Sequence, residues 1–346
     1  KEQSHDKAMG LGRADSRAVS SFFLERTMEE VLRVAIAGAS GIGKHHAKWF
    51  HQAGAQVVGF YGSNEASVAV TSKALKALFP FSGRGYWDLD QMLAEETPDL
   101  LDVCLPNEAH FDCVQRAFER GCHVLCEKPM VWHPEGASQT RTQGQALVDL
   151  SRVADRRLGV CTQYAASLPH YLQLYEAARG PLDNIESFYA EMETVARGRR
   201  RTAEEIWIDM GPHPLSLLLA WMPVGTIEPA SLQVDLRDAE TQTRFDFVGP
   251  WGTCPCEIVV RDLIEGQPIR RFGLNDFLVD CTGRAVDGVY CSVLSTEKTE
   301  LVGEDFMSLL IAQFAEAVQQ PDLLSLVPGE IGLRNLELQL QILQSV

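Results

Sequence analysis

Residues 34–43 read VAIAGASGIG, an apolar run that passes into a glycine-rich turn and then into an amphipathic stretch. The run has the character of a buried strand, and the turn leads into a helix. Backbone amides at such a helix start can bind a pyrophosphate, aided by the helix dipole. We therefore predict a dinucleotide-binding turn, with a purely structural tight turn as the alternative. The predicted binding residues are Gly38, Ser40, Gly41, Ile42 and Gly43, with Ser40 in the place of the usual second glycine.

The first half of the chain alternates short apolar runs with amphipathic stretches, which is typical of a parallel sheet with crossover helices. The predicted strands are 31–37, 56–60, 100–105, 123–127 and 158–163. The predicted helices are 42–53, 64–78 with Asn64 as its N-cap, 89–95, 110–120 and 134–154. This order predicts a doubly wound Rossmann domain over residues 28–163. The polar residues 1–27 resemble an extension or an expression remnant before Met28, with an ordered arm on a partner subunit as the alternative.

In the second half, strand-like segments follow one another with few helices between them, which favours a mostly antiparallel sheet. The predicted strands are 184–192, 231–237, 243–248, 256–263, 268–272 and 289–300. The predicted helices are 214–221, 304–318 and 328–344. We expect residues 164–346 to form one α+β domain.

The formal charge of −16 argues against nucleic acid or an anionic membrane as a partner, because both would repel such a chain. No apolar run reaches the roughly 18 to 20 residues of a membrane span, and the N-terminal stretch lacks the apolar core of a signal peptide. We expect a soluble cytoplasmic protein. Its nine cysteines do not form a dense framework, so we predict reduced thiols. Further cysteines or histidines at the spacing of a zinc site are missing around both close cysteine pairs, Cys254 with Cys256 and Cys122 with Cys126. We therefore predict no metal site.

The turn after the second predicted strand bears on the choice between NAD and NADP. An acid that binds the adenosine ribose is typical of NAD enzymes, but the chain reads Tyr61-Gly62-Ser63-Asn64 there. Ser63 and Asn64 can hydrogen-bond a 2′-phosphate, although no Arg or Lys accompanies them. The sequence therefore leaves NAD and NADP open and slightly favours NADP.

Residues 121–129, GCHVLCEKP, resemble the G-x-H-V-x-x-E-K-P segment of the Gfo/Idh/MocA family, which includes glucose-fructose oxidoreductase and inositol dehydrogenase. Residues 43–47 are similar to the family's helix start, and residues 105–110 to its P-N-x-x-H loop. Residues 209–213, DMGPH, are similar to its D-x-G-x-H motif. The resemblance assigns further cofactor contacts to Leu105, Pro106, Asn107, His110, Glu127 and Lys128.

The resemblance implies a Rossmann domain, a C-terminal domain that commonly mediates dimerisation, and a homodimer or homotetramer. It also implies hydride exchange between NAD(P) and a sugar, cyclitol or related compound, with His213 as the catalytic acid or base. An imidazole suits this proton transfer because its pKa lies near neutrality. We expect Asp209 to orient His213 or bind a substrate hydroxyl. Lys128 is expected to stabilise a developing alkoxide or to polarise a carbonyl.

Two positions depart from the family pattern, since Gln163-Tyr164 stands where many members have a basic residue with an aromatic one, and Ser216 replaces an acid. We therefore leave the substrate open. Candidate substrate contacts are Gln163, Tyr164, Arg197 and Trp207. For the two aromatic residues, ordinary packing is the alternative. For Arg197, the alternative is a solvated loop that also contains Arg199, Arg200 and Arg201. Alternative functions are a non-catalytic dinucleotide sensor and an NAD-dependent glycosidase.

Overall fold

The computed structural model describes residues 31–196 and 198–346, and residues 32–346 form one compact unit. A six-stranded parallel sheet has the order β3-β2-β1-β4-β5-β6. Its strands are β1 (Arg33–Ala37), β2 (Gln56–Tyr61), β3 (Arg84–Tyr86), β4 (Leu100–Val103), β5 (His123–Glu127) and β6 (Leu158–Cys161). The predicted Rossmann sheet is confirmed. The sequence analysis missed only β3, whose three residues Arg-Gly-Tyr form no apolar run.

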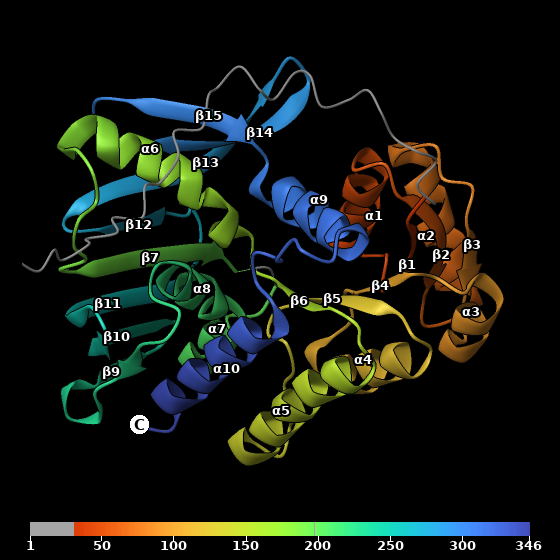
Figure 1. The fold of residues 1–346 in the computed structure, drawn as a ribbon, viewed down its shortest axis with the longest axis horizontal. Coiled ribbons are helices and arrows are strands. Elements are labelled where there is room, and N and C mark those ends of the chain that lie inside the picture. Colours follow the sequence, from red (N-terminus) through yellow and green to blue (C-terminus); the bar gives the residue numbers. More distant parts are fainter. Residues whose placement is uncertain (1–30, 197) are drawn as a thin grey trace, which may run out of the picture. The chain divides into compact units, whose positions relative to one another are not determined.

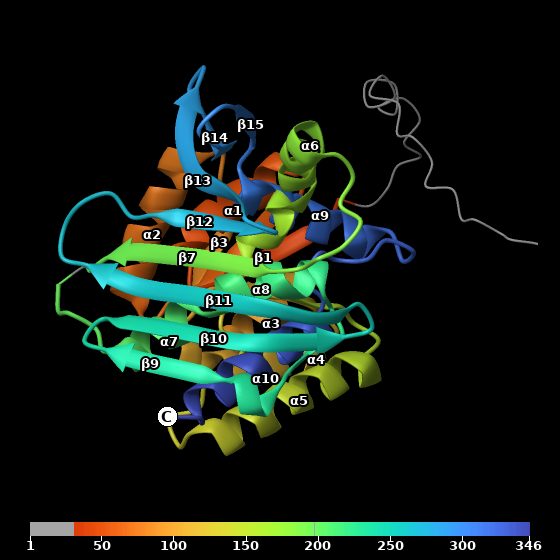
Figure 2. The same ribbon diagram turned by 90° about the vertical axis from the view of Figure 1, so that its left-hand side faces the viewer.

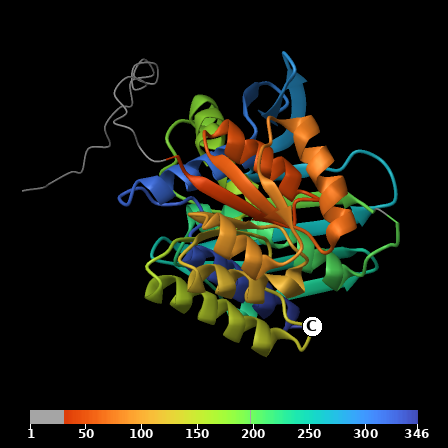
Figure 3. The ribbon, with the colours of Figure 1, turned by 90° about the vertical axis from the view of Figure 1, so that its right-hand side faces the viewer.

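Helices cover both faces of this sheet, as Figures 1 and 3 show. They are α1 (Gly43–Gln52), α2 (Glu65–Leu78), α3 (Leu89–Glu96), α4 (His110–Glu119) and α5 (Ala137–Val153). Asn64 caps α2 as predicted, because its side-chain oxygen accepts a hydrogen bond from the Ser67 amide at 2.9 Å. The strand order reverses between β1 and β4, which places the glycine turn and the loop after β4 side by side at the carboxyl edge.

The second sheet has nine strands in the order β15-β14-β13-β12-β7-β11-β10-β8, with β9 also paired to β10. Its strands are β7 (Phe188–Val195), β8 (Thr226–Ile227), β9 (Gln233–Arg237), β10 (Glu240–Gly249), β11 (Gly252–Leu263), β12 (Arg270–Leu274), β13 (Phe277–Val286), β14 (Val289–Ser295) and β15 (Glu300–Glu304). Every pair is antiparallel except β7 with β11, so the predicted mostly antiparallel sheet is confirmed. The single strand predicted over 289–300 is instead a hairpin, because the chain turns at Thr296–Thr299.

Four elements of the second half were not predicted. They are β8, β13, α6 (Leu168–Arg179) and α7 (Ala203–Met210). The last five residues of β13 are exposed, so little apolar alternation marks this part of it in the sequence. A local signal for α7 was present, since Thr202 and Glu205 form a capping box at its start.

The remaining helices are α8 (Pro212–Trp221), α9 (Phe306–Gln319) and α10 (Gly329–Leu343). Helix α9 packs on the first half, where it contacts α1 and β6, and α10 lies against both halves, since it contacts α5 and α8. The domain boundary after residue 163 stays a prediction. All nine cysteines are free thiols, as predicted. In the described ranges, no helix combines the length and apolar character that crossing a bilayer requires.

Candidate active site

The glycine turn packs tightly against the end of β4. Gly38 has φ of +93°, and its amide donates a hydrogen bond to the Tyr61 carbonyl at 3.0 Å. A Cβ on Gly38 would lie 2.5 Å from the Cys104 carbonyl oxygen, and one on Gly43 would lie 2.5 Å from the Gly38 oxygen. Both positions therefore require glycine. A Cβ on Gly41 would meet no atom within 4 Å, and Ser40, Gly41 and Ile42 are exposed at the start of α1.

Small polar side chains lie at the end of β2. Asn64 caps α2, and its amide nitrogen also donates to Ser63 Oγ at 3.3 Å. Ser63 and Asn64 are exposed, and Gly62 separates them from the last residue of β2. Their hydroxyl and amide groups can hydrogen-bond a ribose or its phosphate, which leaves both dinucleotides compatible with this end of the turn.

His110 connects the loop after β4 to the loop after β5, both of which were predicted to contact the cofactor. Its ring has no exposed surface, with Nε2 2.9 Å from the Leu105 carbonyl and Nδ1 3.0 Å from the Pro129 carbonyl. Burial lowers the pKa of His110. The imidazole therefore positions the loops, while Pro106 is exposed and Asn107 begins the short helix η2 (Asn107–Ala109).

Lys128 and Asp209 meet between the two sheets although 81 residues separate them in the sequence. Lys128 follows β5 directly, and its Nζ donates to the Asp209 carbonyl at 2.9 Å and to the Asp209 carboxylate. Arg201 donates to the same carboxylate at 2.6 Å and to Asp262 at 2.7 Å. Burial by itself raises the pKa of Asp209, but Lys128 and Arg201 outweigh it and lower the pKa to about 2. The carboxylate is therefore ionised at neutral pH.

His213 is the second residue of α8 and lies one helical turn beyond Asp209. Its ring is packed edge-on against Tyr164, with centroids 5.2 Å apart and an interplanar angle of 81°. Burial and then the Lys128 charge lower the pKa of His213 to about 3. Its buried Nδ1 has no hydrogen-bond partner among the described residues. The imidazole is therefore neutral near pH 7.

Helix α10 fixes the joint between α7 and α8. The Gln339 amide donates to the Ile208 carbonyl at 2.8 Å, and Asn335 donates to the Pro212 carbonyl at 2.8 Å. Trp207 donates from its indole nitrogen to the Gln339 carbonyl at 3.1 Å. Trp207 has no exposed surface, so the structure gives it the packing role that the sequence analysis kept as an alternative.

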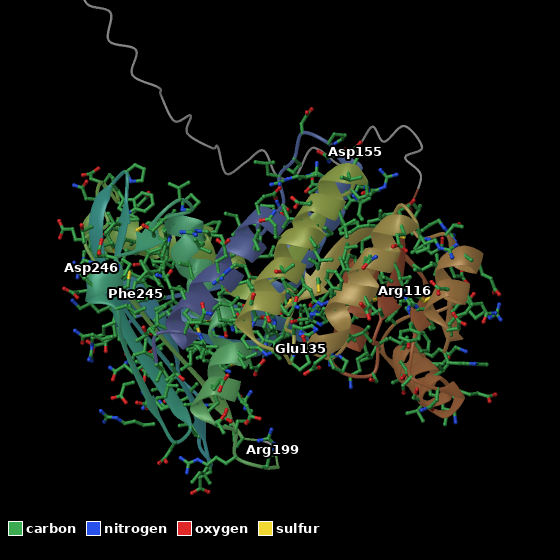
Figure 4. The ribbon with its side chains drawn as sticks, turned by 90° about the horizontal axis from the view of Figure 1, so that it is seen from below. Arg116, Glu135, Asp155, Arg199, Phe245 and Asp246 are labelled. Carbon is green, nitrogen blue, oxygen red and sulfur yellow. The ribbon has the colours of Figure 1, made fainter. Side chains whose placement is uncertain are left out.

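The other candidate substrate residues lie after β6. Gln163 and Tyr164 begin the short helix η3 (Gln163–Ser167), and the Tyr164 hydroxyl accepts a hydrogen bond from Arg270 Nε at 3.1 Å. The hydroxyl groups of Thr162 and Ser216 lie 2.6 Å apart, so Ser216 is satisfied within the core. Arg197 lies outside the described residues. Arg199 pairs with Glu205 at 2.9 Å and lies at the periphery of the molecule (Figure 4).

A family model for oxidoreductases with an NAD-binding Rossmann fold, GFO_IDH_MocA, matches residues 32–152. The chain belongs to the Gfo/Idh/MocA family. It is 35% identical over 255 residues to D-glucoside 3-dehydrogenase of Escherichia coli, an alignment that covers 68% of this chain and 66% of that protein. The chain thus spans about two thirds of the length of this curated relative and smaller shares of others.

Solved Gfo/Idh/MocA-type structures share the fold over nearly the whole chain. UDP-N-acetylglucosamine 3-dehydrogenase from Acidithiobacillus ferrooxidans has a TM-score of 0.68 at 17% identity, covering 92% of this chain and 98% of its own. The WlbA dehydrogenase from Bordetella pertussis, solved with NADH and UDP-GlcNAcA, has a TM-score of 0.68 at 17% identity, covering 92% and 96%. These likenesses support the fold.

Two groups of site residues escaped the sequence analysis of this Gfo/Idh/MocA chain. The first is Arg270 with Asp262, which lie in strands β12 and β11. The adjacent arginines in residues 270–274, RRFGL, were a usable signal for a site residue, since successive side chains of a strand point to opposite faces of the sheet. The second is His46 with Asp102, whose contact links α1 to β4 and has no sequence signature.

His46 is also shared by two groups of potential metal ligands among the described residues. One is His46, Asp102 and Cys104, and the other is His46, Glu127 and Cys161. Burial by itself lowers the pKa of His46, but the adjacent Cys104 and Asp102 side chains outweigh it and raise the pKa well above its usual value. Burial raises the pKa of the Cys104 thiol as well. The His46 imidazole lies between the Asp102 and Glu127 carboxylates, at 3.0 and 3.3 Å, so the cluster is arranged as an ion pair.

Proposed function

We propose that this chain is an NAD(P)-dependent dehydrogenase that oxidises a CH–OH group of a sugar, cyclitol or related polyhydroxy compound. The observation that carries the proposal is the neutral, buried imidazole of His213 beside the Lys128–Asp209 pair. The similarity to a D-glucoside 3-dehydrogenase supports the same substrate class.

Cofactor binding is assigned to the glycine turn, where Gly38 and Gly43 allow the turn to pack closely against the end of β4 and the start of α1. The exposed amides of Ser40, Gly41 and Ile42 then face a pyrophosphate. We propose that both NAD and NADP are accepted, with a slight preference for NADP, because the end of β2 carries Ser63 and Asn64 and no acid. The nicotinamide supplies the hydride acceptor.

His213 accepts the hydroxyl proton of the substrate while hydride leaves the same carbon, which becomes a carbonyl. A neutral imidazole is required for this step, and burial beside Lys128 keeps His213 neutral. The same lowered pKa makes His213 a weaker base than the near-neutral imidazole expected from the sequence. Lys128 donates hydrogen bonds from its ammonium group to the developing alkoxide, where a fixed positive charge in a partly buried site is effective. Asp209 holds that ammonium in place. In the reverse direction the same groups return the proton to the carbonyl oxygen.

The test is turnover by wild type, Lys128→Met and His213→Ala across sugars, sugar acids and inositols, followed at the absorbance of the reduced nicotinamide. We expect each substitution to lower turnover by about 10²- to 10⁴-fold. Cofactor affinity, measured by NADH and NADPH fluorescence, should stay nearly unchanged. Lys73→Met, a change on the exposed side of α2, is the matched surface control.

Three outcomes would contradict the proposal. Unchanged fluorescence of both reduced cofactors on mixing would remove the cofactor assignment. Cofactor binding without turnover of any compound would favour the sensor. Hydrolysis of aryl glycosides without net change in nicotinamide absorbance would favour the glycosidase.

We also propose a homodimer or homotetramer. The second sheet presents β7, β9, β10 and β11 toward the viewer in Figure 2 with no helix in front of them. A sheet face of this kind offers a self-complementary surface for a second copy. Light scattering of the purified chain tests the assembly, and a monomer at all concentrations would contradict it.

A further inference from the structure

Strand β12 begins with two arginines that point to opposite faces of the second sheet. Phe272 lies on the inner face, where its ring contacts Tyr164 and Tyr171. Arg270 lies two residues earlier and therefore shares that face. Arg271 points outward and pairs with Asp280 at 2.7 Å. The inner face at this end of β12 is the one that approaches His213, since Tyr164 contacts both Phe272 and His213.

The contacts of Arg270 leave its charge without a counterion. Nε donates to the Tyr164 hydroxyl at 3.1 Å, and Nη1 donates to the Ile269 carbonyl at 3.2 Å. Neither acceptor is charged. Within the described ranges, no carboxylate lies at ion-pair distance from this guanidinium, although its side chain is only partly exposed.

The other cations of the site are neutralised. Lys128 pairs with Asp209, and Arg201 pairs with both Asp209 and Asp262. The register explains why Arg270 is left out. In the strand register, Arg270 of β12 lies opposite Met192 of β7, and Met192 lies opposite Val260 of β11. Asp262 is two residues beyond Val260 in the same strand. Two strand spacings, roughly 10 Å, therefore separate Arg270 from the carboxylates.

A partly buried guanidinium without a counterion is costly unless a ligand supplies the missing charge. The fork of Arg also matches the geometry of carboxylate and phosphate groups. A chain with a net charge of −16 otherwise repels anions, so an anionic substrate needs a dedicated cation at its site.

We propose that Arg270, positioned by Tyr164, binds an anionic group of the substrate, so that the preferred substrates are sugar acids or sugar phosphates. The inference rests on the proposed dehydrogenase function and narrows its substrate class. The anionic group would lie on the Tyr164 side of His213, away from Lys128. Carboxylate and phosphate share this recognition chemistry, and the experiment separates them.

The experiment compares glucose, glucuronate and glucose 6-phosphate as substrates of wild type, Arg270→Gln and Arg270→Lys. We expect wild type to prefer at least one anion over glucose by kcat/KM. Arg270→Gln should lower the kcat/KM ratio of that anion to glucose roughly 10- to 100-fold, the size of a charged hydrogen bond. Arg270→Lys should restore part of the ratio, because it restores the charge without the fork.

Arg271→Gln is the matched control, since it removes a neighbouring arginine from the outer face, and it should leave the ratio unchanged. Calorimetric titration of glucuronate and glucose 6-phosphate, with the reduced cofactor NADH present, gives a readout that does not need turnover. We expect the binding of one anion to weaken in Arg270→Gln by the same factor.

Glucose oxidation without any preference for either anion would overturn the inference and leave the dehydrogenase function standing. An unchanged kcat/KM ratio of anion to glucose in a folded Arg270→Gln protein would also overturn the inference and leave the dehydrogenase function standing. Absence of all turnover would overturn the proposed function. The titration would then test the anion site independently, and the absence of binding heat with either anion would overturn the role proposed for Arg270. The identity of the preferred anion distinguishes the carboxylate from the phosphate.

Discussion

His46 and Asp102 form an ion pair inside the core: the imidazole Nδ1 lies 3.0 Å from Asp102 Oδ2, and neither side chain has exposed surface. The other ring nitrogen lies 3.3 Å from Glu127 Oε1. Glu127 in turn accepts a hydrogen bond from the Lys128 amide at 3.1 Å. His46 therefore connects α1, the helix that follows the glycine turn, to β4 through Asp102 and to β5, the strand that Lys128 follows, through Glu127.

Replacing His46 by Gln should strongly destabilise the protein. The change leaves two buried carboxylates, Asp102 and Glu127, without their cation. We expect a loss of about 3 to 5 kcal/mol in the free energy of unfolding, measured with urea near neutral pH. His45→Gln, a change at the neighbouring half-buried position, should cost much less. Equal losses in the two variants would show that the ion pair contributes little.

The same ion pair predicts a pH dependence. The pKa of His46 is raised in the folded protein, so its contribution to stability is complete below the unfolded value of about 6.5. That contribution is lost as pH rises through the folded pKa. Urea unfolding between about pH 6 and about pH 9 should therefore show wild type losing stability more steeply than His46→Gln. Parallel curves for the two proteins would contradict a raised pKa.

His213 should remain neutral through the physiological range. Burial and the Lys128 charge lower its pKa to about 3, whereas an unperturbed histidine titrates near 6.5. Imidazole NMR signals assigned by comparison with His213→Gln should not titrate between about pH 5 and about pH 8. In Lys128→Met the pKa of His213 should rise, because one cause of the lowering is removed. A midpoint near 6.5 in wild type would refute the account of its protonation.

Two glycines of the turn should respond differently to alanine. Gly38→Ala places a Cβ at positive φ and 2.5 Å from the Cys104 carbonyl, so we expect destabilisation of about 2 kcal/mol or more. Gly41→Ala meets no neighbour, so stability should change by no more than about 0.5 kcal/mol. Its added methyl group should nevertheless weaken NADH and NADPH binding, measured by fluorescence. Unchanged cofactor affinity in Gly41→Ala would place the pyrophosphate elsewhere.

The end of β2 should control the choice of dinucleotide. Gly62→Asp introduces a carboxylate directly after Tyr61, where an acid can bind a ribose hydroxyl and repel a 2′-phosphate. We expect NADPH affinity to fall at least tenfold relative to NADH affinity in fluorescence titrations. Ser63→Ala, which removes only a hydroxyl, should change the ratio far less. Preserved NADPH binding in Gly62→Asp would contradict the placement of the ribose.

Much of the first half was predictable because its signals are local. Apolar runs separated by amphipathic stretches indicate buried strands and their helices, and Asn64 marks the start of α2 through a bond to a residue three positions away. The second half was harder, since half of β13 is exposed and shows little periodicity. Its capping box at Thr202 was a missed signal.

The sequence by itself determined the parallel sheet, the glycine turn and the identity of Lys128, Asp209 and His213 as candidates, because periodicity and short motifs act within one element. Only the tertiary structure decided that Lys128 meets Asp209, that His46 is buried between two carboxylates, and that Arg270 lies apart from Asp262. These contacts depend on strand register and on which helix faces meet. The physical reason is that charge pairing across the core acts over distances in space, whereas sequence patterns report only which face of its own element a residue occupies.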